Sequence, residues 1–522
     1  MKKYYFTVFN LILYFICIVF SASAQTARNP IIYADVPDMS IIRVGSNYYM
    51  SSTTMHMSPG LPIRKSTDLV NWKIVSYAYD VLDTHSDALN LSNGKNAYGA
   101  GSWASSLRYH NGIYYVTTFS GTTGKTYIFS TKDIEKGPWN SVSFSPSLHD
   151  HSLFFDDDGK TYMIYGSGRL MIAELNDDLS GIKPGTQKVL IENASAPAGD
   201  NINLKAEGSQ LFKINGKYYL FNITWPRNGM RTVIIHRADK ITGPYEGRIG
   251  LQDRGIAQGG LVNTPKGEWF AYLFRDFTAV GRIPYLVPVT WKDGWPVLGT
   301  NDKAPDTLSM LPANKSLVPG IVASDEFNEK TLPLVWQWNH NPDNANWSLS
   351  AQRGYLRITT GRIDSLVLQA RNMLTQRTFG PVCSGITLID ASNMHDGDMA
   401  GLILLQKKFG WVGVKVNGAT KSIVMINGEN AKPVEMQQIL LNQNKVYLKA
   451  ACNFANHTDK GCFYYSLNGK DWVPVGSTLQ MAYTLPHFMG YRFGLFNYAT
   501  KSPGGSVDFD FFHISDKIST DQ

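Results

Sequence analysis

The sequence predicts an all-β protein, a five-bladed β-propeller followed by a C-terminal antiparallel β-sandwich. Two observations lead to this fold class: one strand-turn phrase recurs along the first 300 or so residues, and the pattern of strands changes after them. The composition agrees, because 43% hydrophobic and 12% aromatic residues with 46 Gly are typical of a globular, turn-rich β protein. At 522 residues the chain is long enough for two or three domains.

The propeller is predicted from a phrase in which a turn containing Gly or Asn leads into an aromatic-rich strand. Its copies are GSNYYMSSTT from Gly45, NGIYYVTTFS from Asn111, DDGKTYMIYG from Asp157, NGKYYLFNIT from Asn215 and PKGEWFAYLF from Pro265. They recur at intervals of roughly 45 to 65 residues, which is typical of propeller blades. We therefore expect residues 25–305 to form the propeller. A parallel β-solenoid and an irregular sandwich are the alternatives.

The second domain is predicted from short alternating strands near the C-terminal end. The segment from roughly residue 300 to 320 is rich in Asn, Asp, Lys and Pro, and we expect its residues 306–320 to be a linker or a strap across the first domain. Strand patterns such as GYLRITT from Gly354 and KVYLKAACNF from Lys445 follow. Because alternation of apolar and polar residues marks strands with one buried face, residues 321–516 are predicted to form the sandwich.

The first 24 residues have the pattern of a cleavable signal peptide. Lys2 and Lys3 precede an apolar run from about Phe9 to Phe20, and Ala22-Ser23-Ala24 then offers a small-residue cleavage site. The run is shorter than the roughly 20 apolar residues that a membrane span needs. Cys17 lies inside the run and not after the small residues, so no lipobox is present. We expect a periplasmic or secreted protein.

Charge and cysteine content exclude several function classes. The net charge is +7, but no stretch gathers the 49 Lys and Arg residues into a basic stripe, so no nucleic acid is expected as a partner. The 4 cysteines form no CxxC pair and have no metal-finger spacing. A neutral substrate is the natural expectation.

Three acidic residues occupy matched positions near the starts of blades. Asp38, Asp150 and Glu207 each lie just before or within an apolar strand, and each precedes a copy of the repeated phrase. A single such residue is usually solvated or hydrogen-bonded. Because the inner strands of a small propeller converge at its axis, three of them at equivalent positions predict one shared site.

At these residues the chain resembles glycoside hydrolase family 43, over about the first 300 residues and in order. The matching motifs are DVPDMSIIRVGSNYYM, PGLPIRKSTDLVNW, WAS, DHSLFFDDDGK, AEGSQLFKINGKYYL, GGLVNTPKGEWF and a GR dipeptide leading to VPVTWKDGWPVLG. The resemblance implies a five-bladed propeller in which Asp38 is the general base, Glu207 the general acid and Asp150 the pKa modulator. It also implies that Trp103 stacks on sugar and that Arg282 donates to sugar hydroxyls and to a catalytic carboxylate.

Physical chemistry places demands on these roles. Inversion at a sugar carbon needs an ionised carboxylate that activates water and a protonated carboxyl that protonates the leaving group. Glu207 should therefore lie where burial or the charge of Asp150 raises its pKa. Asp35 competes with Asp38 for the role of base, and the family pattern favours Asp38. His149 and His151 are expected to point away from Asp150, because alternate side chains of a strand share a face.

No cofactor is required by this chemistry, and the metal content is left open. Family members often carry a histidine that reaches a central ion, but Gln258 stands at that place here. In the sandwich, Asp325 and Asp510 lie near the two ends of the domain, where related sandwiches hold a structural calcium. Nothing else in the sequence supports a calcium site there.

The expected function is that of an exo-acting, inverting glycosidase. The resemblance favours the arabinofuranosidase and xylosidase branches, so the substrate would be an oligosaccharide or polysaccharide with pentose side chains. We place release of terminal α-L-arabinofuranosyl residues first. A β-D-xylosidase, a dual activity and a non-catalytic carbohydrate-binding protein are the alternatives.

Overall fold

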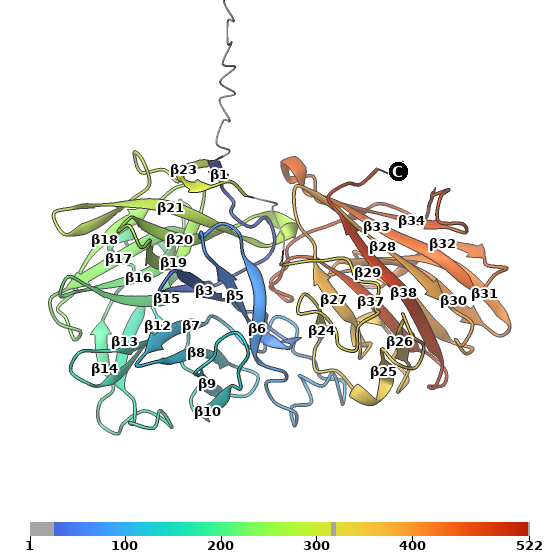
Figure 1. Ribbon diagram of the computed structural model, residues 1–522, viewed down its shortest axis with the longest axis horizontal. Coiled ribbons are helices and arrows are strands. Elements are labelled where there is room, and N and C mark those ends of the chain that lie inside the picture. Colours follow the sequence, from blue (N-terminus) through green and yellow to red (C-terminus); the bar gives the residue numbers. More distant parts are fainter. Residues whose placement is uncertain (1–25, 315–319, 520–522) are drawn as a thin grey trace, which may run out of the picture.

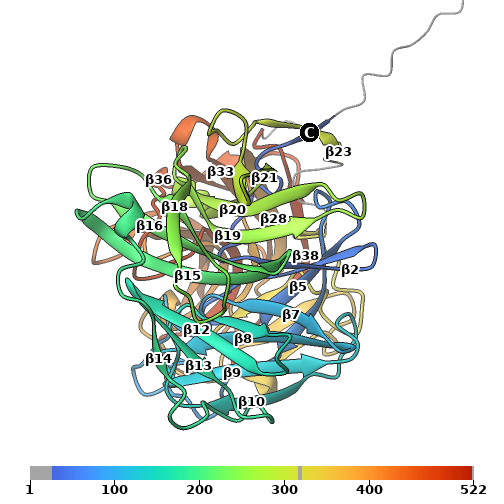
Figure 2. The same cartoon turned by 90° about the vertical axis from the view of Figure 1, so that its left-hand side faces the viewer.

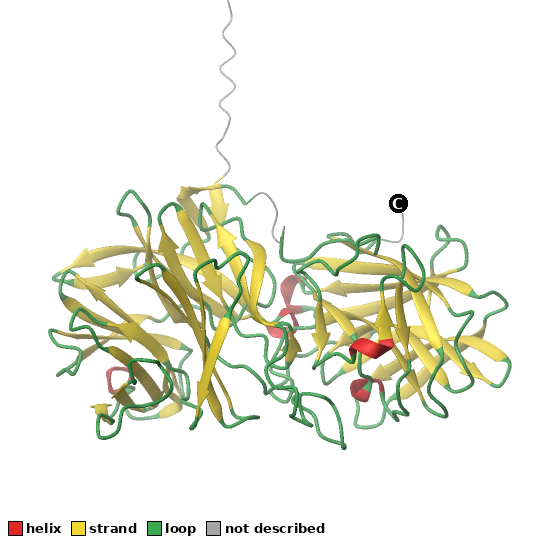
Figure 3. Ribbon diagram, turned by 60° about the horizontal axis from the view of Figure 1, so that its bottom comes forward, coloured by secondary structure: helices red, strands yellow, loops and turns green. Residues whose placement is uncertain are grey.

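The computed structural model describes residues 26–314 and 320–519. The predicted signal peptide, residues 1–24, lies outside the described residues. Within them the fold class predicted from the sequence is confirmed: five four-stranded blades are followed by a two-sheet sandwich (Figure 1). The helical segments of this part are short 3-10 turns (Figure 3): η1 (Ala196–Ala198), η2 (Thr278–Val280), η3 (Asn344–Asn346), η4 (Val367–Gln369) and η5 (Ala455–His457).

The first three blades each contain four antiparallel strands in sequence order, with the first strand innermost. Blade one consists of β2 (Ser40–Val44), β3 (Asn47–Ser51), β5 (Gly60–Ser66) and β6 (Lys73–Tyr79). Blade two consists of β7 (Ser106–His110), β8 (Ile113–Ser120), β9 (Lys125–Thr131) and β10 (Asn140–Phe144). Blade three consists of β11 (Ser152–Phe155), β12 (Thr161–Ser167), β13 (Arg169–Glu174) and β14 (Lys188–Ile191).

The last two blades complete the ring, which Figure 2 shows from the propeller side. Blade four consists of β15 (Ile202–Ile214), β16 (Lys217–Pro226), β17 (Thr232–Ala238) and β18 (Glu246–Leu251). Blade five consists of β19 (Ile256–Asn263), β20 (Trp269–Asp276), β21 (Arg282–Lys292) and β22 (Trp295–Leu298). Inner strand β19 packs against β2 of the first blade, so the last blade meets the first.

The repeated phrases are the hairpins between the first and second strands of the blades. Asn111-Gly112 and Asn215-Gly216 connect such strands, and all four residues have positive φ values, between 49° and 80°. Asn-Gly is the preferred sequence for the two-residue hairpin turns that need this backbone conformation. The aromatic residues after each turn then bury their rings between neighbouring blades, as Tyr218 and Tyr219 do in β16.

A two-stranded ribbon ties the start of the propeller to its end. Strand β1 (Thr26–Arg28) pairs antiparallel with β23 (Thr307–Pro312). The segment 306–320, expected to be a linker, therefore begins with a paired strand. The physical reason is burial, because Ala27 and its partner Leu308 both pack into the hydrophobic core.

The C-terminal domain is a sandwich of two antiparallel sheets. The first sheet contains β24 (Gln337–Asn339), β27 (Leu374–Arg377), β29 (Asp398–Leu405), β30 (Phe409–Asn417), β31 (Thr420–Gly428), β32 (Val434–Leu440) and β37 (Arg492–Ala499). The second contains β25 (Trp347–Ser348), β26 (Leu356–Thr359), β28 (Val382–Asp390), β33 (Lys445–Asn453), β34 (Lys460–Ser466), β35 (Val473–Pro474), β36 (Leu479–Gln480) and β38 (Ser506–Ser515).

The two domains share a sheet edge. Strand β4 (Met57–Ser58), a short excursion of blade one, pairs with β24 of the sandwich. The same seam is tied by the side chain of Gln337, whose Nε2 donates to the Pro59 carbonyl at 2.7 Å. Backbone pairing fixes register as well as contact, so the sandwich is held in one position against the propeller. In the described residues we find no helix with the length and apolar character needed to cross a membrane.

Candidate active site

The three candidate carboxylates are aimed by irregular backbone at the starts of inner strands. Asp38 comes two residues before β2 and Asp150 two residues before β11, and their φ values are 51° and 47°. Aspartate tolerates this left-handed conformation better than most residues. Glu207 lies within β15, where the register with β16 shifts on both sides of it. Such bulges turn a side chain out of the regular pleat.

Residues of all five blades surround one small cavity at the propeller axis. The residues around it come from the loops and inner strands of every blade, and they are Asp38, Met39, Ala104, Asp150, His151, Gly208, Ser209, Gln210, Gln258 and Gly259. Asp38 and Asp150 therefore face the same space. Glu207 does not line this cavity, but one of its carboxylate oxygens lies within 4.8 Å of one of Asp150.

Asp38 is buried and bound to an arginine. Its side chain is 5% exposed, and Nη1 of Arg282 donates to Oδ1 at 2.9 Å and to Oδ2 at 2.8 Å. Burial raises the pKa of the Asp38 carboxyl above its ordinary value, while the charge and hydrogen bonds of Arg282 act in the opposite direction. Arg282, which the family resemblance implied as a donor to a catalytic carboxylate, thus supplies the hydrogen bonds expected for Asp38.

Asp35 has a different environment from Asp38. Its Oδ1 accepts a hydrogen bond from the backbone N–H of Arg282 at 2.7 Å, and its Oδ2 accepts one from Gly490 at 3.1 Å. Gly490 belongs to the sandwich, so Asp35 ties the two domains together. Because both oxygens are held by backbone amides at the seam, the geometry favours Asp38 as the water-activating group.

Asp150 and Glu207 form a second cluster with His149. The Nε2 atom of His149 lies 3.0 Å from Glu207 Oε2 and 3.9 Å from Asp150 Oδ2. Burial raises the pKa of the Asp150 carboxyl to about 7; the charge of His149 opposes this rise and that of Glu207 adds to it. Burial alone would lower the pKa of His149, but its hydrogen bond with Glu207 and the charge of Asp150 raise it to about 9. Asp150 therefore gains and loses its proton near neutral pH, within a cluster in which His149 carries a positive charge.

The placement of His149 differs from the sequence expectation. Residues 149–151 are not in a strand, because β11 begins at Ser152 and Asp150 has a positive φ. Alternation does not apply in such a turn, and His149 faces the carboxylates. His151 packs as expected: it is buried, with Nδ1 against the Leu148 carbonyl at 2.9 Å and Nε2 against Thr117 Oγ1 at 2.7 Å.

An aromatic wall stands beside these carboxylates, and part of it comes from the sandwich. Phe488 precedes β37, and its ring lies 5.2 Å from that of Trp103 and 4.5 Å from the Arg282 guanidinium. Trp103 also stacks on Phe119 at 6.3 Å. Phe488 was missed at the level of sequence, since nothing local marks a residue that enters the site from another domain.

A metal site is supported at this cluster, but not at the position in the sandwich considered from the sequence. In the described part of the chain, the group of histidine and acidic side chains close enough to share an ion is His149, Asp150 and Glu207. Asp325 is engaged by donors: Oδ1 accepts from the Phe327 amide and Oδ2 from the Trp336 indole, both at 2.8 Å. An oxygen that accepts N–H bonds is a poor calcium ligand, so the calcium expected near Asp325 and Asp510 gains no support.

Comparisons with known proteins give the class. A family model described as glycosyl hydrolases family 43 matches residues 27–296. A second model, described as a beta xylosidase C-terminal concanavalin A-like domain, matches residues 324–515. An acid cluster and an arginine-bound carboxylate at one propeller axis fit the two-carboxylate chemistry of glycoside hydrolysis. The chain belongs to glycosyl hydrolase family 43.

Individual relatives carry two kinds of names. The chain is similar to a beta-xylosidase of Formosa agariphila, with 28% identity over 93% of this chain and 90% of the relative. It is also similar to a non-reducing end alpha-L-arabinofuranosidase of Bacteroides ovatus, with 30% identity over 65% of this chain and 66% of the relative. A solved structure described as a bifunctional GH43-CE of Bacteroides eggerthii has 67% identity and a TM-score of 0.94. The match covers 95% of this chain but 64% of that one, so the chain spans less than two thirds of that protein.

Proposed function

We propose that this glycoside hydrolase is exo-acting and inverting, and that it releases terminal α-L-arabinofuranosyl residues from plant hemicellulose side chains or oligosaccharides. The observation that carries the proposal is that the carboxyl groups near the propeller axis lie in two different electrostatic environments. Asp38 is bound to a guanidinium, whereas burial raises the pKa of Asp150, the neighbour of Glu207, to about 7. Groups whose environments drive their protonation apart are the basis for assigning a base and an acid.

In this mechanism Asp38 accepts a proton from water as that water attacks the anomeric carbon. Glu207 donates its proton to the glycosidic oxygen as the bond between the anomeric carbon and that oxygen breaks. His149 orients the Glu207 carboxyl, because its Nε2 lies 3.0 Å from Glu207 Oε2, and the same Nε2 lies 3.9 Å from Asp150 Oδ2. Single displacement by water inverts the configuration at the anomeric carbon. No metal or cofactor takes part in these steps.

Exo action is supported by the aromatic wall. Phe488 and Trp103 stand beside the carboxylates, and Phe488 is carried by a loop of a different domain. Such a wall limits one side of the site and fits a terminal sugar better than a chain that runs through. Stacking of a sugar face on an indole ring is the role the family resemblance implied for Trp103.

A β-D-xylosidase is the second candidate, and the names of relatives favour it. Relatives from Formosa agariphila, Xylanibacter ruminicola and Vibrio are called beta-xylosidases or xylan 1,3-beta-xylosidase. The two terminal sugars present similar hydroxyls and similar shape, so one pocket can accept both. The proposal therefore includes a dual activity as its closest variant.

The test is hydrolysis of p-nitrophenyl α-L-arabinofuranoside and p-nitrophenyl β-D-xyloside by the mature protein, with the Asp38→Ala variant as blank. Proton NMR of the first-formed sugar then reads its anomeric configuration. A larger kcat/KM for the arabinofuranoside and an inverted product support the proposal. Preference for the xyloside makes the second candidate correct. No release of sugar from either glycoside by a folded sample contradicts both.

Location in the cell is part of the same proposal. We propose export to the periplasm or the medium with cleavage after Ala24, supported by the pattern of Lys2, Lys3 and the apolar run behind them. N-terminal sequencing of protein from the periplasmic fraction checks the cleavage.

A further inference from the structure

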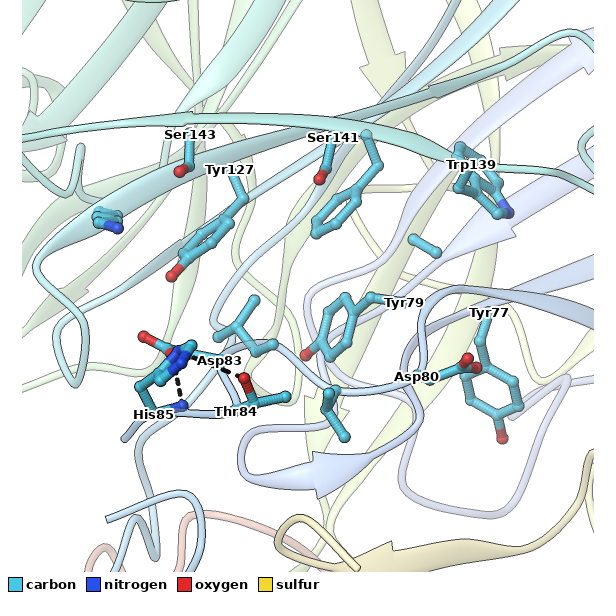
Figure 4. Close-up of a pocket in the computed structure, with 15 residues that line it drawn as sticks. Tyr77, Tyr79, Asp80, Asp83, Thr84, His85, Tyr127, Trp139, Ser141 and Ser143 are labelled. Carbon is cyan, nitrogen blue, oxygen red and sulfur yellow. Dashed lines mark hydrogen bonds and ion pairs between the residues drawn. The ribbon is translucent and has the colours of Figure 1, made fainter. Parts of the chain in front are cut away.

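A second hollow lies away from the axial cavity, between the outer strands of blades one and two (Figure 4). It has a volume of about 820 Å³ and is lined by the end of β6, by the loop 80–85 and by strands β9 and β10. We call it the blade groove. None of the residues that line it lines the axial cavity, so the proposed mechanism does not use it.

The floor of the blade groove contains aromatic rings from both blades. The Tyr79 ring of β6 stacks on Phe129 of β9 with centroids 5.4 Å apart and planes at 29°. Tyr127, also in β9, lies parallel to Phe129 at 6.2 Å and 6°. Trp139 stands at one end (Figure 4). Tyr127 and Phe129 belong to the core, since they are only 7% and 4% exposed, so the partly exposed Tyr79 and Trp139 are the aromatic side chains of the groove that a sugar ring can contact.

Serine hydroxyl groups and a few charged side chains of both signs surround the rings. Ser141 and Ser143 lie two residues apart in β10, so both side chains point to the groove, and both residues are exposed. The charged side chains of the rim are Asp80, Asp83 and Lys125. A single lysine does not suit an anionic ligand, and aromatic rings flanked by hydroxyls suit a neutral, hydroxyl-rich one.

The blade groove opens at the same end of the propeller as the catalytic carboxylates. Strands alternate in direction within a blade, so the end of β6, the start of β9 and the end of β10 share the end at which the inner strands begin. Asp38 and Asp150 precede inner strands at that end. The loop 80–85 of the groove therefore lies at the end of the propeller that holds the axial site.

From this placement we propose that the blade groove binds a segment of a neutral polysaccharide main chain while one of its terminal side-chain sugars occupies the axial site. The inference rests on the proposed exo-acting function and deepens it, because it names what holds the rest of the substrate. A second binding site on one protein raises the affinity for a polymer without affecting a small substrate. The groove therefore distinguishes polymeric from short substrates.

Two variants of neighbouring residues test the groove. Ser141→Trp fills it, whereas Val142→Trp places the same side chain on the opposite face of the same strand, where Val142 is 37% exposed. The kcat/KM for arabinose release from soluble arabinoxylan is compared with that for p-nitrophenyl α-L-arabinofuranoside. We expect Ser141→Trp to lower kcat/KM on arabinoxylan roughly tenfold, because polymer binding becomes weaker by about that factor. Its kcat/KM on the aryl glycoside should be unchanged. Val142→Trp should retain both activities.

A binding measurement keeps this result separate from the proposed function. Migration of the protein in native gels that contain arabinoxylan is measured for the unmodified chain and for both variants. Retardation that is lost in Ser141→Trp and kept in Val142→Trp supports the groove even if no arabinose is released, in which case the proposed function alone fails. Equal retardation and equal arabinoxylan kinetics for the two variants overturn the groove.

Discussion

Phe488 of the C-terminal sandwich lies over the guanidinium of Arg282 in the propeller, with the Arg282 Cζ atom 4.5 Å from the ring centroid. The same guanidinium donates to both oxygens of Asp38. A residue of the second domain therefore packs on the group that supports the candidate base. The axial site is built by two domains, and its properties should change when either partner in this contact is altered.

Phe488→Ala should lower kcat/KM roughly tenfold on p-nitrophenyl α-L-arabinofuranoside. The ring contributes a cation–π contact of about 0.5 to 2 kcal/mol with Arg282 and keeps water from the Arg282–Asp38 pair. Leu485→Ala is the matched control, because Leu485 lies in the same loop and is 71% exposed. Steady-state kinetics of both variants check the prediction, and equal losses in the two would contradict it.

Asp38→Asn should reduce kcat by roughly 10³-fold, since removal of a general base typically costs between about 10² and 10⁴. Asp35→Asn should instead lower the free energy of unfolding by about 1 to 3 kcal/mol, because the amide NH₂ would face one of the two backbone N–H groups now bound to Asp35. Kinetics and thermal melting of both variants separate the roles. If Asp35→Asn is the stable but inactive variant, Asp35 is the base.

Glu207→Gln should be most harmful where the leaving group is poor. A p-nitrophenolate ion leaves with little protonation, so this variant should retain more activity on the aryl glycoside than on an arabino-oligosaccharide, by roughly 10-fold or more. Asp38→Asn should lose a similar factor on both substrates. The ratio of the two kcat/KM values for each variant is the measurement. A ratio for Glu207→Gln equal to that of the unmodified protein would remove Glu207 from the role of acid.

His149→Gln should change both stability and the pH profile of activity. The folded pKa of His149, about 9, lies above the ordinary value of 6.5, so its contribution to stability is complete below about pH 6.5 and is lost as pH rises through about 9. The Tm difference between the unmodified protein and His149→Gln should therefore be larger at pH 6 than at pH 9.5. Thermal melts at the two pH values check this.

Activity gives a second readout for His149. Its positive charge lowers the pKa of Asp150, which stands at about 7, so removing that charge should raise the pKa of the cluster. The alkaline limb of the kcat/KM profile should then move to higher pH in His149→Gln. His85→Gln is the control, because the side chain of His85 is 95% exposed and remote in the groove rim. An unmoved alkaline limb in His149→Gln would show that the histidine has no electrostatic role in the reaction.

Much of the fold and the three carboxylates could be predicted because the blades repeat. The Asn-Gly turns and aromatic strands mark each blade, and a repeat tells where an inner strand begins and hence which acids converge at the axis. The predicted orientation of His149, away from Asp150, was wrong for a local reason. The rule of alternating side chains holds in strands, and the positive φ of Asp150 breaks it one residue away.

Contacts between domains were beyond the reach of the sequence. Phe488 contacts Arg282 across more than 200 residues of chain, and the pairing of β4 with β24 depends on how two separately predicted domains meet. No periodicity or motif encodes such a meeting. The strand β23 was missed for the same reason, because its partner β1 lies at the other end of the propeller sequence.

The seam between the domains provides the last prediction, through a glycine. A Cβ atom added at Gly490 would lie 2.1 Å from the Val280 carbonyl oxygen and 3.0 Å from Asp35 Cβ. Gly490→Ala should therefore push the loop that carries Phe488 away from Arg282, and overpacking of this kind costs about 1 to 3 kcal/mol. Both Tm and kcat/KM on the aryl arabinofuranoside should fall.

Gly121→Ala is the matched control for this experiment, since an added Cβ at Gly121 meets nothing within 4 Å. It should leave Tm and kcat/KM close to those of the unmodified protein. Because Gly490 contacts no substrate-facing carboxylate directly, a loss of activity in Gly490→Ala at temperatures where the variant is fully folded would show that the sandwich shapes the site. Full activity in that folded variant would mean that the sandwich only stabilises the propeller, and that the position of Phe488 is irrelevant to turnover.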